Sequence, residues 1–226
     1  MKLNRILIFV FGFIAFFSCT TSKTLTSAVK SNEVTDLQFI EPFSYISLIE
    51  KGNRGKYNDE LSNESKHLLI KVSNSYQNQI SLKGDIFVSD VLTKRKLENE
   101  IKYLCFSADR QRSISNLKLT PVIDSLLELS GKRFGLITVS MGFTRAKGNY
   151  GGQIAKGAAM GILTLGMYYQ TPIKSFSTVY AMIVDAKENN IAFFRKSFLQ
   201  DKNPLDEAVL MKQFQKIFEG YFWTKK

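Results

Sequence analysis

The sequence predicts a single α+β domain in which a mixed β-sheet packs against α-helices. Three observations lead to this fold class. The stretch from Phe134 to Phe198 contains three apolar strand patterns, and in the first, LITVSMGF, alternate residues fall on opposite faces. Segments on both sides of this stretch repeat apolar residues at helical spacing. Finally, 226 residues with 44% hydrophobic content are enough to bury a core.

Turn residues divide the chain before this stretch into separate patterns. Phe43 to Glu50 is rich in aromatic and β-branched residues, which predicts a strand. Apolar residues at helical spacing predict one helix from about Asp59 to Tyr76 and another that begins at Asp90. The other expected features are a turn at 53–56, a short strand at 84–88, a loop at 107–116 and a helix that starts at Thr120-Pro121 and stops at Gly131.

The second half of the chain predicts three strands and a final helix. The first strand is LITVSMGF, and the stretch from Lys174 to Asp185, apolar on both faces toward its end, is typical of a central strand. A polar turn at 186–190 and a strand at 191–198 complete a hairpin. Asn203-Pro204 is expected to begin a long helix whose apolar residues continue to Tyr221.

The amino terminus has the pattern of an export signal. Positive residues Lys2 and Arg5 precede an apolar run at 6–17, which is too short to span a membrane as a helix. Ser18 then stands directly before Cys19. These residues resemble the lipobox of bacterial lipoproteins, with Phe16 at the position where leucine is usual. The resemblance implies a lipoprotein signal peptide at 1–18 and a lipid, such as palmitate, on Cys19.

Residues 20–36 are polar, poor in aromatic residues and without periodicity, as in a tether. The expected organisation is therefore a lipidated amino terminus and flexible tether at 19–36, followed by one domain at 37–226. In the lipoprotein resemblance, Thr20 in place of aspartate implies transfer to the outer membrane, where the domain would face the periplasm. A lipid on Cys19 leaves Cys105 without a disulfide partner, and a buried free thiol is the favoured interpretation.

The formal net charge is +11, and the basic residues are scattered rather than grouped in a run. This distribution favours a solvated cationic surface over a nucleic-acid-binding face, so no nucleic-acid partner is expected.

A glycine-rich insert at 148–169 interrupts the strand patterns. Gly157 and Gly161 have the spacing that lets helices approach closely, and Ile162 and Leu165 follow them. Three interpretations stay open: a helix or loop packed tightly on its own sheet, an element that docks on a partner or inserts into a membrane, or a ligand-binding loop. The insert lacks the GK[ST] ending of a phosphate loop and any dinucleotide-binding pattern. Gly157, Gly161, Ile162 and Leu165 are the candidate partner contacts.

The chain from about Phe43 to Phe222 resembles a group of periplasmic lipoprotein domains. This group includes the amino-terminal domain of the Tol-system β-propeller protein, the curli-export lipoprotein and the outer-membrane lipoprotein activator of penicillin-binding proteins. The matching pattern is a helix, the turn at 131–135 into LITVSMGF, and then STVYAMIVDAK before a hairpin. Glu188-Asn189-Asn190 replaces the glycine that usually follows the aspartate turn. The resemblance implies protein binding or ring assembly, and it assigns no site residues.

The residue inventory does not favour catalysis. The chain has one histidine, His67, and neither a metal-ligand cluster nor a GxSxG motif. Five aspartates are expected to serve turns or caps: Asp85, Asp90, Asp109, Asp124 and Asp185. We therefore expect a lipid-anchored, non-catalytic accessory without a cofactor or metal, which binds another envelope protein. The alternative is a homo-oligomeric subunit of an envelope secretion pore that uses 148–169 as its membrane or partner contact.

Overall fold

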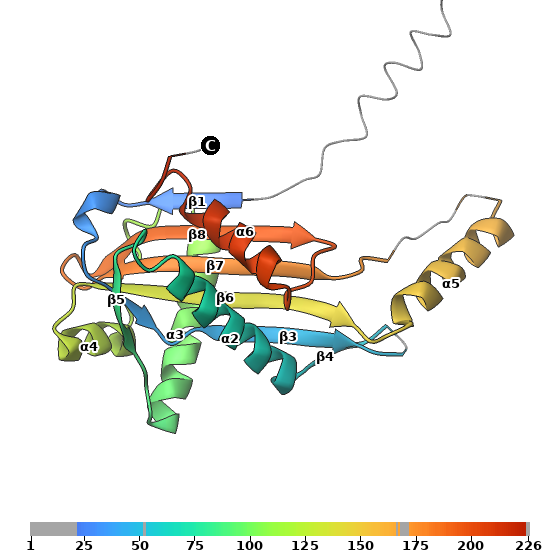
Figure 1. The fold of residues 1–226 in the computed structure, drawn as a ribbon, viewed down its shortest axis with the longest axis horizontal. Helices are drawn as coiled ribbons and strands as arrows, with labels where there is room; N and C mark the ends of the chain where they lie inside the picture. The colour runs from blue at the N-terminus through green and yellow to red at the C-terminus, as the bar shows by residue number, and fades with distance from the viewer. Residues whose placement is uncertain (1–21, 52, 166, 168–171, 225–226) are drawn as a thin grey trace, which may run out of the picture.

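The computed structural model describes residues 22–51, 53–165, 167 and 172–224. The described residues form one eight-stranded mixed sheet with α-helices on both faces, so the expected α+β class is confirmed (Figure 1). The strands are β1 (Ser22–Thr26), β2 (Leu37–Ile40), β3 (Phe43–Ile49), β4 (Gly55–Tyr57), β5 (Leu82–Ile86), β6 (Phe134–Arg145), β7 (Phe176–Asp185) and β8 (Asn190–Gln200). The helices are η2 (Ser31–Glu33), α2 (Asp59–Ser75), α3 (Val91–Arg110), α4 (Pro121–Ser130), α5 (Asn149–Leu163) and α6 (Glu207–Phe218).

Strand β6 lies at the centre of the sheet. One of its edges pairs antiparallel with β7, which continues antiparallel into β8 and then β1. Its other edge pairs parallel with β2 over the first residues and with β3 over the remainder. Strand β5 extends the sheet beside β2, and β4 extends it beside β3. A single strand therefore joins every part of the sheet.

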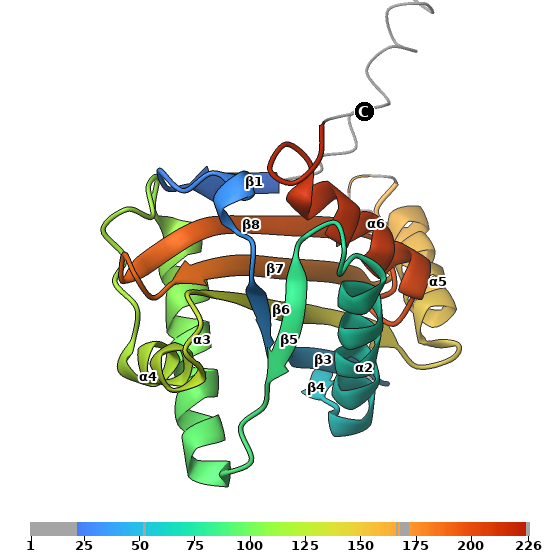
Figure 2. The ribbon, with the colours of Figure 1, turned by 60° about the vertical axis from the view of Figure 1, so that its left-hand side comes forward.

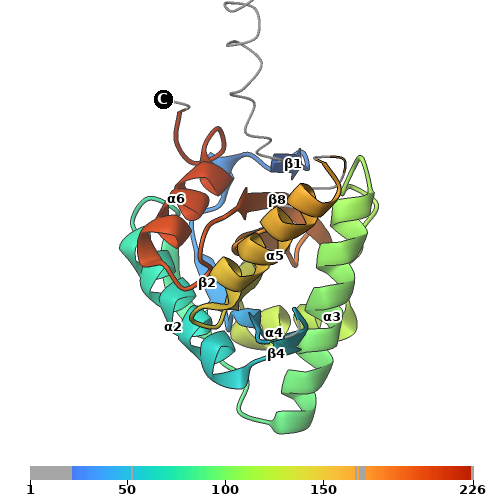
Figure 3. The same cartoon turned by 90° about the vertical axis from the view of Figure 1, so that its right-hand side faces the viewer.

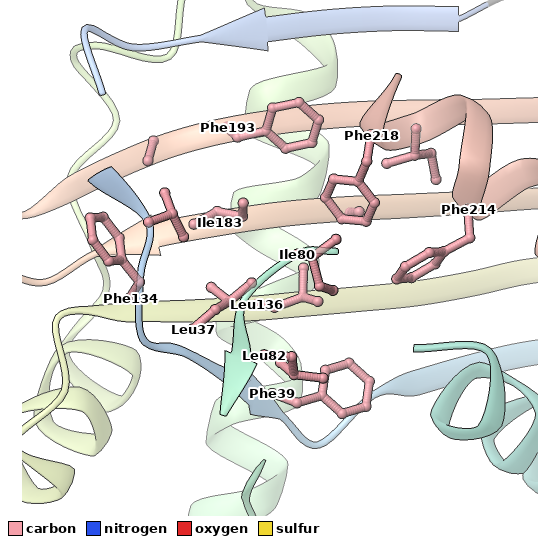
Figure 4. Packing of buried hydrophobic residues seen from close by; sticks show 14 of the residues in the cluster. Leu37, Phe39, Ile80, Leu82, Phe134, Leu136, Ile183, Phe193, Phe214 and Phe218 are labelled. Atoms are coloured by element: carbon pink, nitrogen blue, oxygen red, sulfur yellow. The ribbon is translucent and has the colours of Figure 1, made fainter. Parts of the chain in front are cut away.

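Helices α2 and α6 cover one face of the sheet (Figure 2). Phe214 and Phe218 of α6 stack toward Phe193 of β8, with ring centroids of Phe193 and Phe218 5.5 Å apart. Figure 4 shows these rings beside Leu136 of β6 and Phe39 of β2. This cluster contains more buried aromatic side chains than the cluster on the opposite face of the sheet.

Helices α3 and α4 cover the opposite face, toward the end of the sheet that lies away from α5 (Figures 1 and 3). Leu97, Ile101 and Leu104 of α3 pack with alternate residues of β6 and β7 such as Ile137 and Met182. The alternation expected for LITVSMGF is confirmed, because Ile137 and Val139 belong to this cluster while Leu136 belongs to the other.

The expected tether is wrong from Ser22 onward. Residues 22–26 form β1, which pairs antiparallel with β8 from Ser22 to Thr26. Val29 and Val34 are buried, at 8% and 1% exposure, in the same cluster as α6. The sequence does not predict this segment, because its residues are mostly polar. It is held by backbone hydrogen bonds to a sheet edge and by two isolated apolar contacts, and neither produces a periodic pattern.

Several boundaries also differ from the sequence expectation. Helix α3 continues through 107–110, within the expected loop, because Ala108 is fully buried. The final helix begins at Glu207 rather than at Asn203-Pro204, since Asp206 accepts hydrogen bonds from the backbone N–H groups of Ala208 and Val209. Strands β2 and β4 were not expected. The helix at 121–130 is confirmed, and Gly131 ends it with φ +63°.

Strand β6 enters the sheet through a buried ion pair. The guanidinium of Arg133 donates to both carboxylate oxygens of Asp185, at 2.9 and 2.8 Å, and Asp185 is fully buried. Asp185 also accepts the backbone N–H of Lys187 at 3.0 Å, which holds the β7–β8 turn. Hydrogen bonding to Asp185 raises the pKa of Arg133.

We expect Asp185→Ala to lower the free energy of unfolding by about 3 kcal/mol, because it leaves a partly buried guanidinium and two turn amides without their acceptor. Urea titration measures this loss. The matched control is Lys71→Ala, which removes an ion pair with Glu207 in which the Lys71 side chain is 63% exposed, and should cost less than about 1 kcal/mol. Equal losses in the two variants would show that the Arg133 pair does not anchor β6.

Candidate interaction surface around α5 and the open face of the sheet

Helix α5 projects from the end of the sheet as an arm (Figures 1 and 3). None of the residues at 149–163 is buried. The apolar side chains at its outer end are largely in solvent: Ile162 is 78% exposed, Leu163 77%, Leu165 91% and Met167 85%. The interpretation that the insert packs tightly on its own sheet is therefore wrong for α5. An exposed apolar cluster of this kind is typical of a surface that binds something.

Arg145, the last residue of β6, fixes the base of the arm. Its guanidinium donates to the carbonyl of Ile173 at 2.9 Å, to the side-chain oxygen of Asn53 at 2.6 Å and to that of Asn149 at 2.7 Å. Asn149, the first residue of α5, donates in turn to the carbonyl of Glu50 at 2.6 Å. Four chain segments therefore meet at one guanidinium, and the direction of α5 is set by the sheet.

An open cleft of about 490 Å³ lies between the base of α5 and the end of the sheet. Gly157 and Met160 of α5 line it on one side, and Ile49 and Phe143 of the sheet line it on the other. The predicted contact Gly157 therefore lies where the arm faces the sheet. The remaining lining residues are Asn53, Arg145, Gln153, Lys156, Pro172 and Ile173.

A second cleft, of about 270 Å³, opens on the same face of the sheet beside α3. Its lining is largely apolar and includes Phe106 of α3 and Met141 of β6. Met141 and Phe143 point to the same face because they are two residues apart on one strand. The other lining residues are Tyr45, Lys102, Cys105, Val139 and Tyr180.

Three aromatic side chains lie on this face of the sheet, and one of them, Phe143, lines the first cleft. Phe143 makes an edge-on contact with Phe176, with ring centroids 4.8 Å apart, and Phe176 lies 5.8 Å from Phe198. These rings are partly exposed, since α3 and α4 cover only the other end of this face. The two clefts together with Phe143, Phe176 and Phe198 are called the apolar strip below.

At the second cleft, the polar side chains of Tyr45 and Lys102 are both paired with Glu98. The hydroxyl of Tyr45 donates to Glu98 at 2.7 Å, and Lys102 donates to the same carboxylate oxygen at 2.8 Å. Burial favours the protonated form of Glu98, but the hydrogen bonds from Lys102 and Tyr45 outweigh it and lower the pKa. Burial and the Glu98 hydrogen bond raise the pKa of Tyr45. Tyr45 is therefore a neutral donor that keeps Glu98 charged.

The structure separates the other groups that could carry chemistry. Cys105 lies on α3 and His67 on α2, so they are on opposite faces of the sheet and do not form a nucleophile–base pair. Of the predicted structural aspartates, Asp90 caps α3, and Asp109 pairs with Lys196 at 2.8 Å.

Within the described residues, no group of three or more His, Cys, Asp or Glu side chains could hold a metal ion. No described helix is both long and apolar enough to cross a bilayer.

The predicted site residues fall into three places. Gly157 lies in the cleft under α5, whereas Ile162 and Leu165 lie at the outer end of the arm, and Gly161 is partly exposed between them. Cys19 lies outside the described residues. Sequence reasoning missed Met160 and Phe106, which flank the apolar strip. The alternation of LITVSMGF placed Met141 and Phe143 on one face, but no sequence signal showed that this part of the face lacks a covering helix.

The Cys105 thiol is expected to be inert in the folded protein. Burial raises its pKa to about 12, and the nearby carboxylate of Asp109 adds to the effect. We expect an aromatic disulfide reagent at mildly alkaline pH to leave Cys105 unmodified in the native chain and to modify it fully in denaturant. Native-state modification at the rate of a free thiol would place Cys105 at the surface of the cleft.

No protein-family model matches the sequence, and no curated protein matches it. Solved structures that are similar to this chain include the PelC dodecamer from Paraburkholderia phytofirmans, at 8% identity and a TM-score of 0.40, over 91% of this chain and 99% of that chain. The LpoB C-terminal domain from Salmonella enterica is similar at 8% identity and a TM-score of 0.30, over 77% and 87% of the two chains. A DUF4136 family protein from Bacteroides thetaiotaomicron is similar at 9% identity and a TM-score of 0.37, over 91% and 98%. No functional inference follows from likeness at this level.

Proposed function

We propose that this chain is a lipid-anchored protein of the bacterial envelope. It acts without catalysis, by binding another envelope protein through the apolar strip. The anchor is Cys19, after removal of residues 1–18, and the domain faces the periplasm from the outer membrane. The observation that carries protein binding is the apolar strip, where two clefts and three partly exposed aromatic rings share one face of the sheet.

The composition of the strip supports protein binding over a reaction. Aromatic and methionine side chains are enriched in the centres of protein interfaces, where they supply large apolar contact area. At the second cleft Tyr45 and Lys102 are paired with Glu98, and at the first cleft Arg145 is paired with Asn53 and Asn149. A reaction centre would instead need polar groups that converge on an open position.

A homo-oligomeric subunit of an envelope secretion pore is the second candidate. The observation that favours it is α5, whose exposed apolar end would suit contact with a second copy as well as with a different protein. Both candidates place the contact on the same side of the molecule, and the identity of the bound chain separates them.

The lipid anchor is tested by metabolic labelling with a palmitate analogue. We expect Cys19→Ala to abolish labelling and to release the chain from the outer-membrane fraction. Cys105→Ala is the matched control, because it removes the other cysteine of the chain and should leave labelling unchanged. Labelling that survives Cys19→Ala would contradict the anchor.

Partner binding is tested by photo-crosslinking in intact cells. A crosslinking amino acid replaces Phe106 or Met160, which border the strip and are 45% and 46% exposed, or Leu129 of α4, which is 87% exposed. We expect Phe106 and Met160 to yield one shared envelope protein that Leu129 does not yield. Adducts of this chain with itself would favour the pore subunit. The same products from all three positions, or none, would contradict binding at the strip.

A further inference from the structure

Strand β1 begins near the end of the sheet from which the arm projects, and it then runs away from that end along β8 (Figure 1). Ser22 pairs with Ser197, near the end of β8 at Gln200, and Gln200 pairs with Phe176 at the start of β7. Phe176 pairs with Phe143, at the end of β6 from which α5 follows. Figures 1 and 3 agree that α5 rises from the end of β6 toward the side of the sheet where β1 forms the edge.

Residues 22–26 form a strand rather than part of a flexible tether, so the link between Cys19 and the folded domain is short. Ser22 is the third residue after Cys19, so a lipid on Cys19 lies within about 10 Å of the first paired residue of the sheet. A tether running to residue 36 would have let the domain stand well away from the membrane. With a lipid on Cys19, the sheet edge at Ser22, near the end from which α5 projects, would instead be held next to the bilayer.

The charge of this region suits an anionic surface. No acidic residue occurs between Glu128 and Asp185, whereas the part of that stretch beside α5 contains the basic residues Arg145, Lys147, Lys156 and Lys174. Lys147 just before α5 and Lys156 in its middle are exposed, and the acidic residues that line the clefts beside them, Glu50, Asp201 and Asp206, lie on other segments. Apolar side chains beyond a basic base are the arrangement by which peripheral segments hold anionic lipid surfaces.

We propose that the outer end of α5 is a second membrane contact, in which Ile162, Leu163 and Leu165 insert into the surface of the anionic bilayer that carries the Cys19 lipid. Lys147 and Lys156 lie at the level of the headgroups. This inference rests on the proposed lipid anchor.

The test uses the full lipid-anchored chain in vesicles of phosphatidylethanolamine and phosphatidylglycerol. A polarity-sensitive fluorophore is attached at Leu163→Cys or, as the matched control, at Leu129→Cys, an exposed leucine at the end of α4. We expect quenching by spin-labelled lipid to be about threefold stronger at Leu163 than at Leu129, because interfacial segments bury their apolar side chains below the headgroups. Ile162→Asp with Leu165→Asp should remove the difference, and so should Lys147→Glu with Lys156→Glu.

Each outcome separates this inference from the function on which it rests. Equal quenching at Leu163 and Leu129 in a chain that is acylated and vesicle-bound overturns the membrane contact and leaves the lipid anchor standing. Shielding of the Leu163 fluorophore from water without quenching by spin-labelled lipid also overturns it, and assigns the arm to a protein partner. A chain that carries no acyl group overturns the anchor itself.

Discussion

The structure depends on the burial of β6 between two different sets of partners. Residues 134–143 of this strand pair with β7 along one edge, and the strand pairs with β2 and then β3 along the other. Both faces of its first half are covered by helices. Gly142 is required within it, because a Cβ there would collide with the carbonyl oxygen of Phe176. The strand is held at its start by the Arg133–Asp185 ion pair and at its end by the hydrogen bonds of Arg145.

The two ends of β6 consequently differ in what surrounds them. At the start, α3 and α4 complete the core, where Ile137 and Met182 lie in one buried cluster with residues of both helices. At the end, the chain leaves the sheet as α5 and returns after it, so Phe143 and Phe176 keep a partly exposed side. One end of the sheet therefore serves stability, whereas the other presents apolar surface. The proposed protein contact and the proposed membrane contact both lie at this second end.

Sequence reasoning reached the elements whose signals are local. The helices α2 and α4 and the hairpin of β7 and β8 were predicted, because periodicity, a proline start and a glycine stop are set by neighbouring residues. Strands β1 and β2 were missed, since a short strand at a sheet edge or beside a parallel partner takes its stability from distant backbone groups. The same contrast between local and distant signals applies to the candidate site. Ile162 and Leu165 were predicted as contacts from the local insert pattern, whereas Phe106 and Met160 were not predicted.

The sequence by itself determined the α+β class, the position of the glycine-rich insert and the export pattern that ends at Cys19. These follow from residue order, because hydrophobic periodicity and short motifs act over a few residues. Only the tertiary structure decided that residues 22–36 belong to the domain, that α5 leaves the sheet without burying a side chain, and that β1 begins near the end from which α5 projects. Those facts depend on which strand edges are already paired and which faces of the sheet are already covered by helices. Both depend on residues that are far apart in the sequence and meet only in the folded chain.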